Sequence, residues 1–192
     1  MKDFIFTSSF GQTSHQFSFN KDLEKFALKL EKTSPSVVRS NQNGYHSDYL
    51  DITIPLIKKF YDAIRPAVDV YIQSLNIERP YDFYFNQPWL NVNRKGASNN
   101  THNHPHNFLA GVYYIKTPPL CGDLYFLSTR CSSLSVLRYS KYTNENSSFW
   151  KIKAKAGNLV IFPADILHTV QANQSNKPRI SLSFNINIKQ GN

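Results

Sequence analysis

Three of the six histidines lie within five residues, in the segment 102–106 with the sequence HNHPH. In an extended segment alternate side chains point to the same side, so His102, His104 and His106 would share one face. Imidazole is the commonest protein ligand for metals such as iron and zinc. The segment therefore predicts a metal site that leaves positions open for other ligands. The alternative is a histidine-rich surface loop.

Two later residues favour the metal site. His168 follows an apolar segment at residues 157–163, and Arg179 begins the last apolar segment of the chain. Alone, a histidine in this position is more often a buried structural residue. A histidine cluster, a distal histidine and an arginine in this order indicate one cavity that binds a metal and an anion together.

Helices are expected in the first part of the chain. Apolar residues recur at helical spacing over residues 21–32 and again over 55–75. Asn20 is expected to cap the first helix. Pro66 is expected to kink or split the second, because proline cannot donate a helix hydrogen bond.

Short strands separated by turn residues are expected after Pro80. Pro88 predicts a break inside the first of them. Many short strands preceded by helices are typical of a mainly β fold, a jelly roll with N-terminal helices packed on its outer face. The expected strands are residues 4–6, 81–93, 108–116, 123–128, 134–139, 149–154, 158–162, 166–171 and 179–188.

The last segment has the clearest pattern. A period of two places its apolar residues on one face of a strand and its polar residues on the other. In a jelly roll with helices outside, the apolar face packs on the helices and the polar face looks into the barrel. The apolar set is Ile180, Leu182, Phe184, Ile186 and Ile188, and the polar set is Arg179, Ser181, Ser183, Asn185 and Asn187.

The 192 residues are expected to form one domain, with a mostly helical support region at 1–79 and a β core at 80–190. The net charge is +9, but the basic residues are scattered, which favours a basic protein over a dedicated nucleic-acid surface. Cys121 and Cys131 are expected to be reduced, because two cysteines are too few for a disulfide framework. No signal peptide or membrane span is recognised, so a cytoplasmic protein without membrane contact is expected.

Several short motifs occur in order from about residue 40 to 188 and together cover most of the chain. Each is moderately specific, and the ordered set is much more specific. The motifs are residues 40–47 (SNQNGYHS), 89–96 (WLNVNRKG), 102–105 (HNHP), 110–114 (AGVYY), 157–163 (GNLVIFP), 168–170 (HTV) and 179–185 (RISLSFN).

In these motifs the chain resembles the 2-oxoglutarate/iron(II) oxygenase superfamily, and within it a group of small oxygenases common in bacteria and phages. The resemblance implies a double-stranded β-helix, the cupin-like form of the jelly roll. It also implies a dioxygenase that uses Fe(II), 2-oxoglutarate and O2. Such an enzyme oxidises a C–H bond of its prime substrate, most often by hydroxylation, and decarboxylates 2-oxoglutarate to succinate.

The resemblance assigns roles to individual residues. His102 and His104 would be the first pair of metal ligands, and His168 would be the distal ligand. Arg179 would pair with the far carboxylate of 2-oxoglutarate, because a planar guanidinium binds a carboxylate bidentately. Ser181, two residues on and on the same strand face, would add a hydroxyl hydrogen bond.

Further candidates for the cofactor site lie on the expected strands. Asn91 and Asn93 are on a strand that should line the barrel. Tyr113 or its neighbour Tyr114 would reach the 2-oxoglutarate, and Tyr113 is our candidate, although aromatic residues of strands are as often core residues. His46 is expected near the mouth of the site.

One position departs from the superfamily pattern. Most members have an aspartate or glutamate where this chain has His104, and three neutral histidines carry one less negative charge. Such a site should stabilise the higher oxidation states of iron less well. Asp165 is the nearest acid to His168 in the sequence, but nothing places it on the metal. His106 is expected to support the site or face the substrate, and His15 is expected on the surface.

Two other functions fit the same residues. One is a metal-binding jelly-roll module without turnover. The other is a three-histidine cupin-type dioxygenase that does not use 2-oxoglutarate, which leaves Arg179 unexplained unless it binds an acidic substrate. The prime substrate and the oligomeric state are open. The basic charge slightly favours a nucleic-acid substrate, which a steep salt dependence of binding would reveal.

Overall fold

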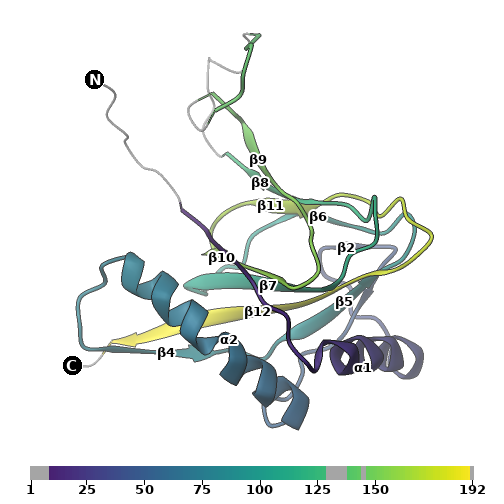
Figure 1. Ribbon diagram of the computed structural model, residues 1–192, viewed down its shortest axis with the longest axis horizontal. Coiled ribbons are helices and arrows are strands. Elements are labelled where there is room, and N and C mark those ends of the chain that lie inside the picture. Colours follow the sequence, from purple (N-terminus) through teal and green to yellow (C-terminus); the bar gives the residue numbers. More distant parts are fainter. Residues whose placement is uncertain (1–8, 129–137, 144–145, 191–192) are drawn as a thin grey trace.

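The computed structural model describes residues 9–128, 138–143 and 146–190. Within them the strands form two antiparallel sheets, and two helices lie against one of these sheets (Figure 1). The prediction of a mainly β jelly roll with helices outside is confirmed. Neither helix combines the length and the apolar content that crossing a membrane requires, as judged over the described residues.

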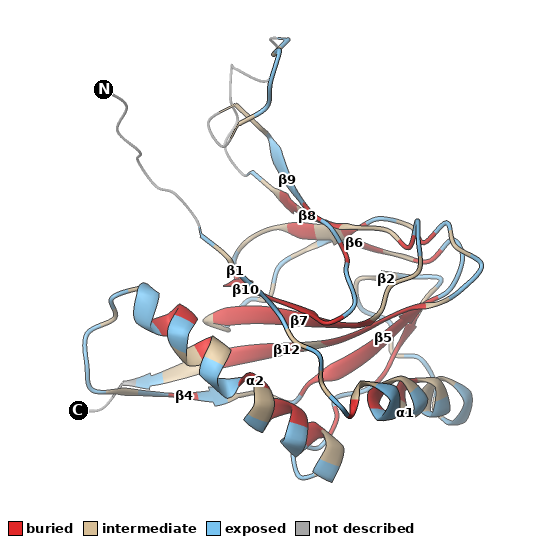
Figure 2. Ribbon diagram, viewed as in Figure 1, coloured by how far each residue is buried: buried red, intermediate tan, exposed pale blue. Residues whose placement is uncertain are grey.

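The larger sheet has seven strands in the order β1-β10-β7-β12-β5-β3, with β4 also paired to β12. Its central strands are buried on both faces (Figure 2). The strands are β1 Gly11–Ser14, β3 Tyr45–His46, β4 Tyr81–Phe85, β5 Trp89–Asn93, β7 Leu109–Lys116, β10 Asn158–Pro163 and β12 Arg179–Gln190.

The smaller sheet has five strands in the order β2-β6-β11-β8-β9. The hairpin of β8 and β9 extends away from the helices (Figure 1). The strands are β2 Asn41–Gln42, β6 Ser98–His102, β8 Leu124–Leu127, β9 Phe149–Ile152 and β11 His168–Val170.

The helices α1 (Asn20–Thr33) and α2 (Pro55–Ser74) cover the outer face of the larger sheet (Figure 1). Their apolar stripes join the apolar side of β12 in one core, as the alternation of that strand predicted. α2 is not split at Pro66. This proline lies on the exposed side of the helix, where water can satisfy the carbonyl of Asp62 that loses its helix hydrogen bond.

The prediction that Asn20 caps α1 is wrong. The N-cap residue is Phe19, and no side chain caps the helix. The Asn20 side chain instead donates to the carbonyl of Ile115 at 3.1 Å and accepts from the Tyr113 hydroxyl at 3.0 Å. These bonds tie the start of α1 to β7.

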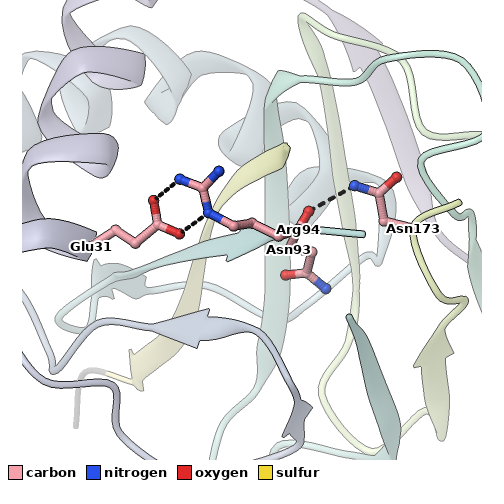
Figure 3. Close-up of polar contacts among 4 residues, drawn as sticks. All are labelled: Glu31, Asn93, Arg94 and Asn173. Carbon is pink, nitrogen blue, oxygen red and sulfur yellow. Dashed lines mark hydrogen bonds and ion pairs between the residues drawn. The ribbon is translucent and has the colours of Figure 1, made fainter. Parts of the chain in front are cut away.

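The end of β5 is held from two sides, and Figure 3 shows both contacts. Arg94 forms a bidentate ion pair with Glu31 of α1, with both distances 2.7 Å. The fully buried Asn173 donates to the carbonyl of Asn93 at 2.8 Å. Helix, sheet and the loop before β12 are thereby fixed at the end where β12 begins with Arg179.

Pro88 breaks the segment 81–93 into β4 and β5, as predicted. Residues 138–139 carry no strand, and the rest of the segment expected at 134–139 lies outside the described residues, as does the strand expected at 4–6. Four strands were not predicted, namely β1, β2, β3 and β6. The first three come from residues 1–79, so this region contributes to both sheets as well as carrying the helices. The interpretation as a single domain stays a prediction.

Candidate active site

The structure brings His102, His104 and His168 together. His102 ends β6 and His168 begins β11, and the two residues are direct partners across these strands. His104 follows two residues after β6, where its backbone N–H donates to the carbonyl of Ala164 at 2.8 Å. One nitrogen from each ring lies within 4.8 Å of the other two, and the Nε2 atoms of His104 and His168 are 3.2 Å apart.

Backbone carbonyls orient two of these rings. The Nδ1 atom of His102 lies 2.7 Å from the carbonyl of Asn100, and the Nδ1 atom of His168 lies 2.9 Å from the carbonyl of Ile166. With Nδ1–H donating to a carbonyl, the lone pair of the ring is left on Nε2. Metal-binding histidines in proteins are commonly fixed in this way.

Burial keeps the three rings neutral near pH 7. Burial, together with the smaller effect of the neighbouring His102, lowers the pKa of His168 to about 3 and the pKa of His104 to about 4. The pKa of His102 is also lowered by burial. Only neutral imidazole binds a metal, so the cluster is in the state that binding requires.

Trp89 forms one wall of the cluster. Its ring stacks on His104 with centroids 5.6 Å apart, and the ring of His46 also stacks on it at 5.7 Å. The Nδ1 atom of His46 lies 2.6 Å from the carbonyl of Ser47. His46 is buried and lines the same cavity, close to where it was expected.

Arg179 lies in the same cavity and is only 2% exposed. Its guanidinium contacts the Ser181 hydroxyl at 3.5 Å and lies 5.0 Å from the centroid of the Tyr114 ring. No carboxylate of the described residues pairs with it. An unpaired buried charge is strongly unfavourable, so this side chain needs an anionic ligand.

Some other polar atoms of the lining also lack partners. Among the described residues, five buried side-chain polar atoms have none, and four of them belong to residues that line this cavity of about 760 Å³. The four are Asn91 Oδ1, Tyr114 Oη, Arg179 Nε and Asn185 Oδ1. Asn185 also interacts with His104, and Tyr114 with Arg179. Buried polar groups are normally hydrogen-bonded, so Asn91 Oδ1 and Arg179 Nε are the atoms that indicate a polar ligand.

The prediction that Tyr113 reaches the co-substrate is wrong. Neighbouring residues of a strand face opposite sides, and Tyr113 lies in the outer core, where it contacts Phe60 and donates to Asn20. Tyr114 faces the cavity instead. The choice between the two depends on strand register, which the sequence does not reveal.

The other candidates have clear positions. Asn91 and Ser181 line the cavity, while Asn93 does not and instead donates to the lining residue Asn99 at 3.2 Å. His106 is exposed and has a positive φ of 66°, and it is not part of the cluster.

Asp165 is exposed, and among the described residues no carboxylate joins the three histidines. The Nε2 atom of His15 lies 2.8 Å from the Thr13 hydroxyl, and His15 does not line the cavity. Sequence reasoning gave no role to Trp89, although its position in the motif 89–96 was a signal.

A protein family described as "Putative 2OG-Fe(II) oxygenase" matches residues 87–185, which run from just before β5 into β12. The match covers more than half of the chain. This protein belongs to that family. It is therefore a 2-oxoglutarate-dependent oxygenase, and its cofactor and co-substrates are Fe(II), 2-oxoglutarate and O2, as predicted.

Several solved structures share the fold. A prolyl-4-hydroxylase from Pseudomonas putida has a TM-score of 0.67 at 15% identity, and the similarity covers 96% of this chain and 95% of that one. The α-ketoglutarate-dependent epimerase SnoN of nogalamycin biosynthesis has a TM-score of 0.69 at 11% identity, with 93% and 76% covered. HygX from Streptomyces hygroscopicus, with nickel and 2-oxoglutarate bound, has a TM-score of 0.63 at 11% identity, with 94% and 83% covered. No curated protein sequence matches the chain significantly.

Proposed function

We propose that this oxygenase is a hydroxylase that couples oxidation of a C–H bond to the decarboxylation of 2-oxoglutarate. The products would be the hydroxylated substrate, succinate and CO2, with one atom of O2 in the new hydroxyl group and the other in succinate. The observation that carries the proposal is the buried, unpaired Arg179 in the same cavity as the histidine cluster. A guanidinium placed there fits the far carboxylate of a dicarboxylic acid.

The donor set fits iron(II). His102, His104 and His168 would hold the metal through nitrogen atoms, and imidazole suits iron. Bound iron(II) supplies the chemistry that activates O2 and drives the decarboxylation. The protein keeps the three rings neutral and oriented, and three protein ligands leave positions for 2-oxoglutarate and O2.

The polar wall would orient the co-substrate. Arg179 would bind the far carboxylate, with the hydroxyl groups of Ser181 and Tyr114 on either side as further donors. Asn91 lines the same cavity and has an unpaired amide oxygen. The family match does not support the two alternatives of a module without turnover and a dioxygenase that does not use 2-oxoglutarate.

Calorimetric titration of the iron(II) protein with 2-oxoglutarate under anaerobic conditions tests this role of Arg179. Arg179→Ala should weaken 2-oxoglutarate binding by roughly 30-fold or more, because it removes a buried charge-assisted pair worth about 2 kcal/mol or more. Arg179→Lys should lose less, because it keeps the charge but not the bidentate geometry. Unchanged binding in Arg179→Ala would exclude this role of the arginine.

A further inference from the structure

We propose that the prime substrate carries an anionic group, a carboxylate or a phosphate, which Arg39 binds at the solvent end of the cavity. This inference rests on the proposed function, because it takes the inner arginine to be occupied by 2-oxoglutarate. It adds the chemical class of the substrate and a residue that selects for it.

The first support is the sign of the charge in the cavity. Its charged lining residues among the described ones are Arg39 and Arg179, and no aspartate or glutamate lines it. Asp123, a carboxylate near Tyr114, lies outside the lining and pairs with Lys151 at 3.0 Å. A cavity lined by one sign of charge concentrates ligands of the opposite sign.

The second support is the absence of a carboxylate in the metal cluster. The 2-oxoglutarate dianion balances the two charges of iron(II), so Arg179 leaves the loaded site with one net positive charge. His104 contributes none of the negative charge that an aspartate or glutamate would add at its position. Arg39 raises the net positive charge of the loaded site to two, and an anionic substrate would reduce this charge.

The third support is the state of Arg39 itself. It is exposed at the rim, and no carboxylate of the described residues forms an ion pair with it. Its backbone N–H donates to Asn41 Oδ1 at 2.8 Å, which fixes the main chain there. The positive charge of Arg39 acts on His46 inside the cavity. Asp48 acts on His46 with a negative charge, but Asp48 is not part of the lining.

Two aromatic residues of the same lining indicate what the rest of the substrate contacts. Trp89 and Tyr49 both line the cavity, and Tyr49 meets the edge of Trp89 with ring centroids 6.0 Å apart. Trp89 is buried but Tyr49 is half exposed, so Tyr49 is the part of this aromatic surface that is open to a ligand. An anion attached to an apolar or aromatic body would therefore contact the arginine and the aromatic wall together.

Three small probes of similar shape test the proposal: phenylacetate, phenyl phosphate and the neutral phenylacetamide. Their binding to the protein loaded with iron(II) and saturating 2-oxoglutarate is measured by anaerobic calorimetry, so no turnover is needed. At least one anion should bind about tenfold more tightly than phenylacetamide, the effect of one charge-assisted contact. The comparison of the two anions distinguishes a carboxylate site from a phosphate site.

Arg39→Gln should remove the preference for the anion, and Arg39→Lys should keep part of it. Lys25→Gln is the matched control, because it removes one exposed positive charge from α1 outside the cavity. Equal binding of the three probes, binding of none of them, or a preference that survives in Arg39→Gln would overturn the proposal. Failure of the proposed function is separate, since 2-oxoglutarate would then not bind to the iron(II) protein before any probe is added.

Discussion

At the scale of single residues, His104 is the most distinctive feature of this site. It supplies a neutral nitrogen where most members of the wider superfamily have a carboxylate, and no described carboxylate takes over that role. His168 is buried, His102 and His104 are half-buried, and all three rings are neutral before any metal binds. Two consequences can be measured, one in the metal-free protein and one on metal binding.

The metal-free protein should lose stability as the pH falls below about 6.5. The folded-state pKa values of His168 and His104, about 3 and about 4, lie below the ordinary value of 6.5. The unfolded chain therefore binds more protons in this range, and protonation favours unfolding. Each ring should contribute up to about 1.4 kcal/mol per pH unit to the slope of the unfolding free energy.

Urea unfolding of the metal-free protein at a series of pH values measures this slope. His168→Gln should have a shallower slope than the wild type, because glutamine does not titrate. Equal slopes for the two proteins would contradict the assignment of a buried, neutral His168.

Trp89 should support metal binding through its stack on His104. Trp89→Ala removes the wall that fixes this ring, so the affinity for cobalt(II), followed by its visible absorption, should fall by roughly tenfold. Trp89→Phe should restore part of the affinity, because it keeps an aromatic face. The exposed Trp150 offers the control Trp150→Phe, which should leave the affinity unchanged. An unaltered affinity in a folded Trp89→Ala protein would show that the stack does not position the ligand.

At the scale of elements, β7 and β12 must approach closely to hold the site. Gly111 of β7 faces Phe184 of β12, and a Cβ atom on Gly111 would lie 2.3 Å from the Phe184 ring. Phe184 is fully buried against Phe60 and Phe85, so it has little room to move. Gly111→Ala should therefore lower the free energy of unfolding by about 1–3 kcal/mol.

Denaturant unfolding measures this cost, and Phe184→Leu provides the matched test. Gly111→Ala should lower the free energy of unfolding less in the Phe184→Leu background than in the wild type, because the shorter leucine side chain leaves room for the new methyl group. Additive effects of the two substitutions would mean that the clash is absent.

The elements also show what sequence patterns can predict. β12 was predicted with its faces correct, because its apolar and polar residues alternate strictly. β6 was not predicted, because Ser98–His102 is polar throughout and lacks such a pattern, although it carries His102. Tyr113 and Tyr114 are identical neighbours on a strand buried on both faces, so composition could not decide which one faces the cavity.

At the scale of the whole molecule, the histidines lie where the smaller sheet leads into the larger one. His102 and His168 belong to the smaller sheet, and His104 lies on the segment that leads from it to β7 of the larger one. Sequence order and motif spacing predicted this grouping. The contribution of residues 1–79 to both sheets could not be predicted, because β2 and β3 have two residues each.

Metal binding should therefore stabilise the entire fold. Manganese(II) at about 100 times its dissociation constant should raise Tm by roughly 5–10 °C, the shift expected for about 2.7 kcal/mol in a chain of this size. Thermal unfolding with and without the metal measures the shift. His168→Ala should remove it, whereas His106→Ala should keep it, because His106 is exposed and outside the cluster. A shift that persists in His168→Ala would place the metal elsewhere.

The central claim is that iron(II) on the three histidines and 2-oxoglutarate on Arg179 occupy one cavity at the same time. Anaerobic titration of the iron(II) protein with 2-oxoglutarate, followed by visible absorption, tests it most directly. We expect a weak charge-transfer band that grows to saturation with 2-oxoglutarate, is lost in His168→Ala, and requires much more 2-oxoglutarate in Arg179→Ala. A wild-type protein that binds iron(II) but develops no band would contradict it.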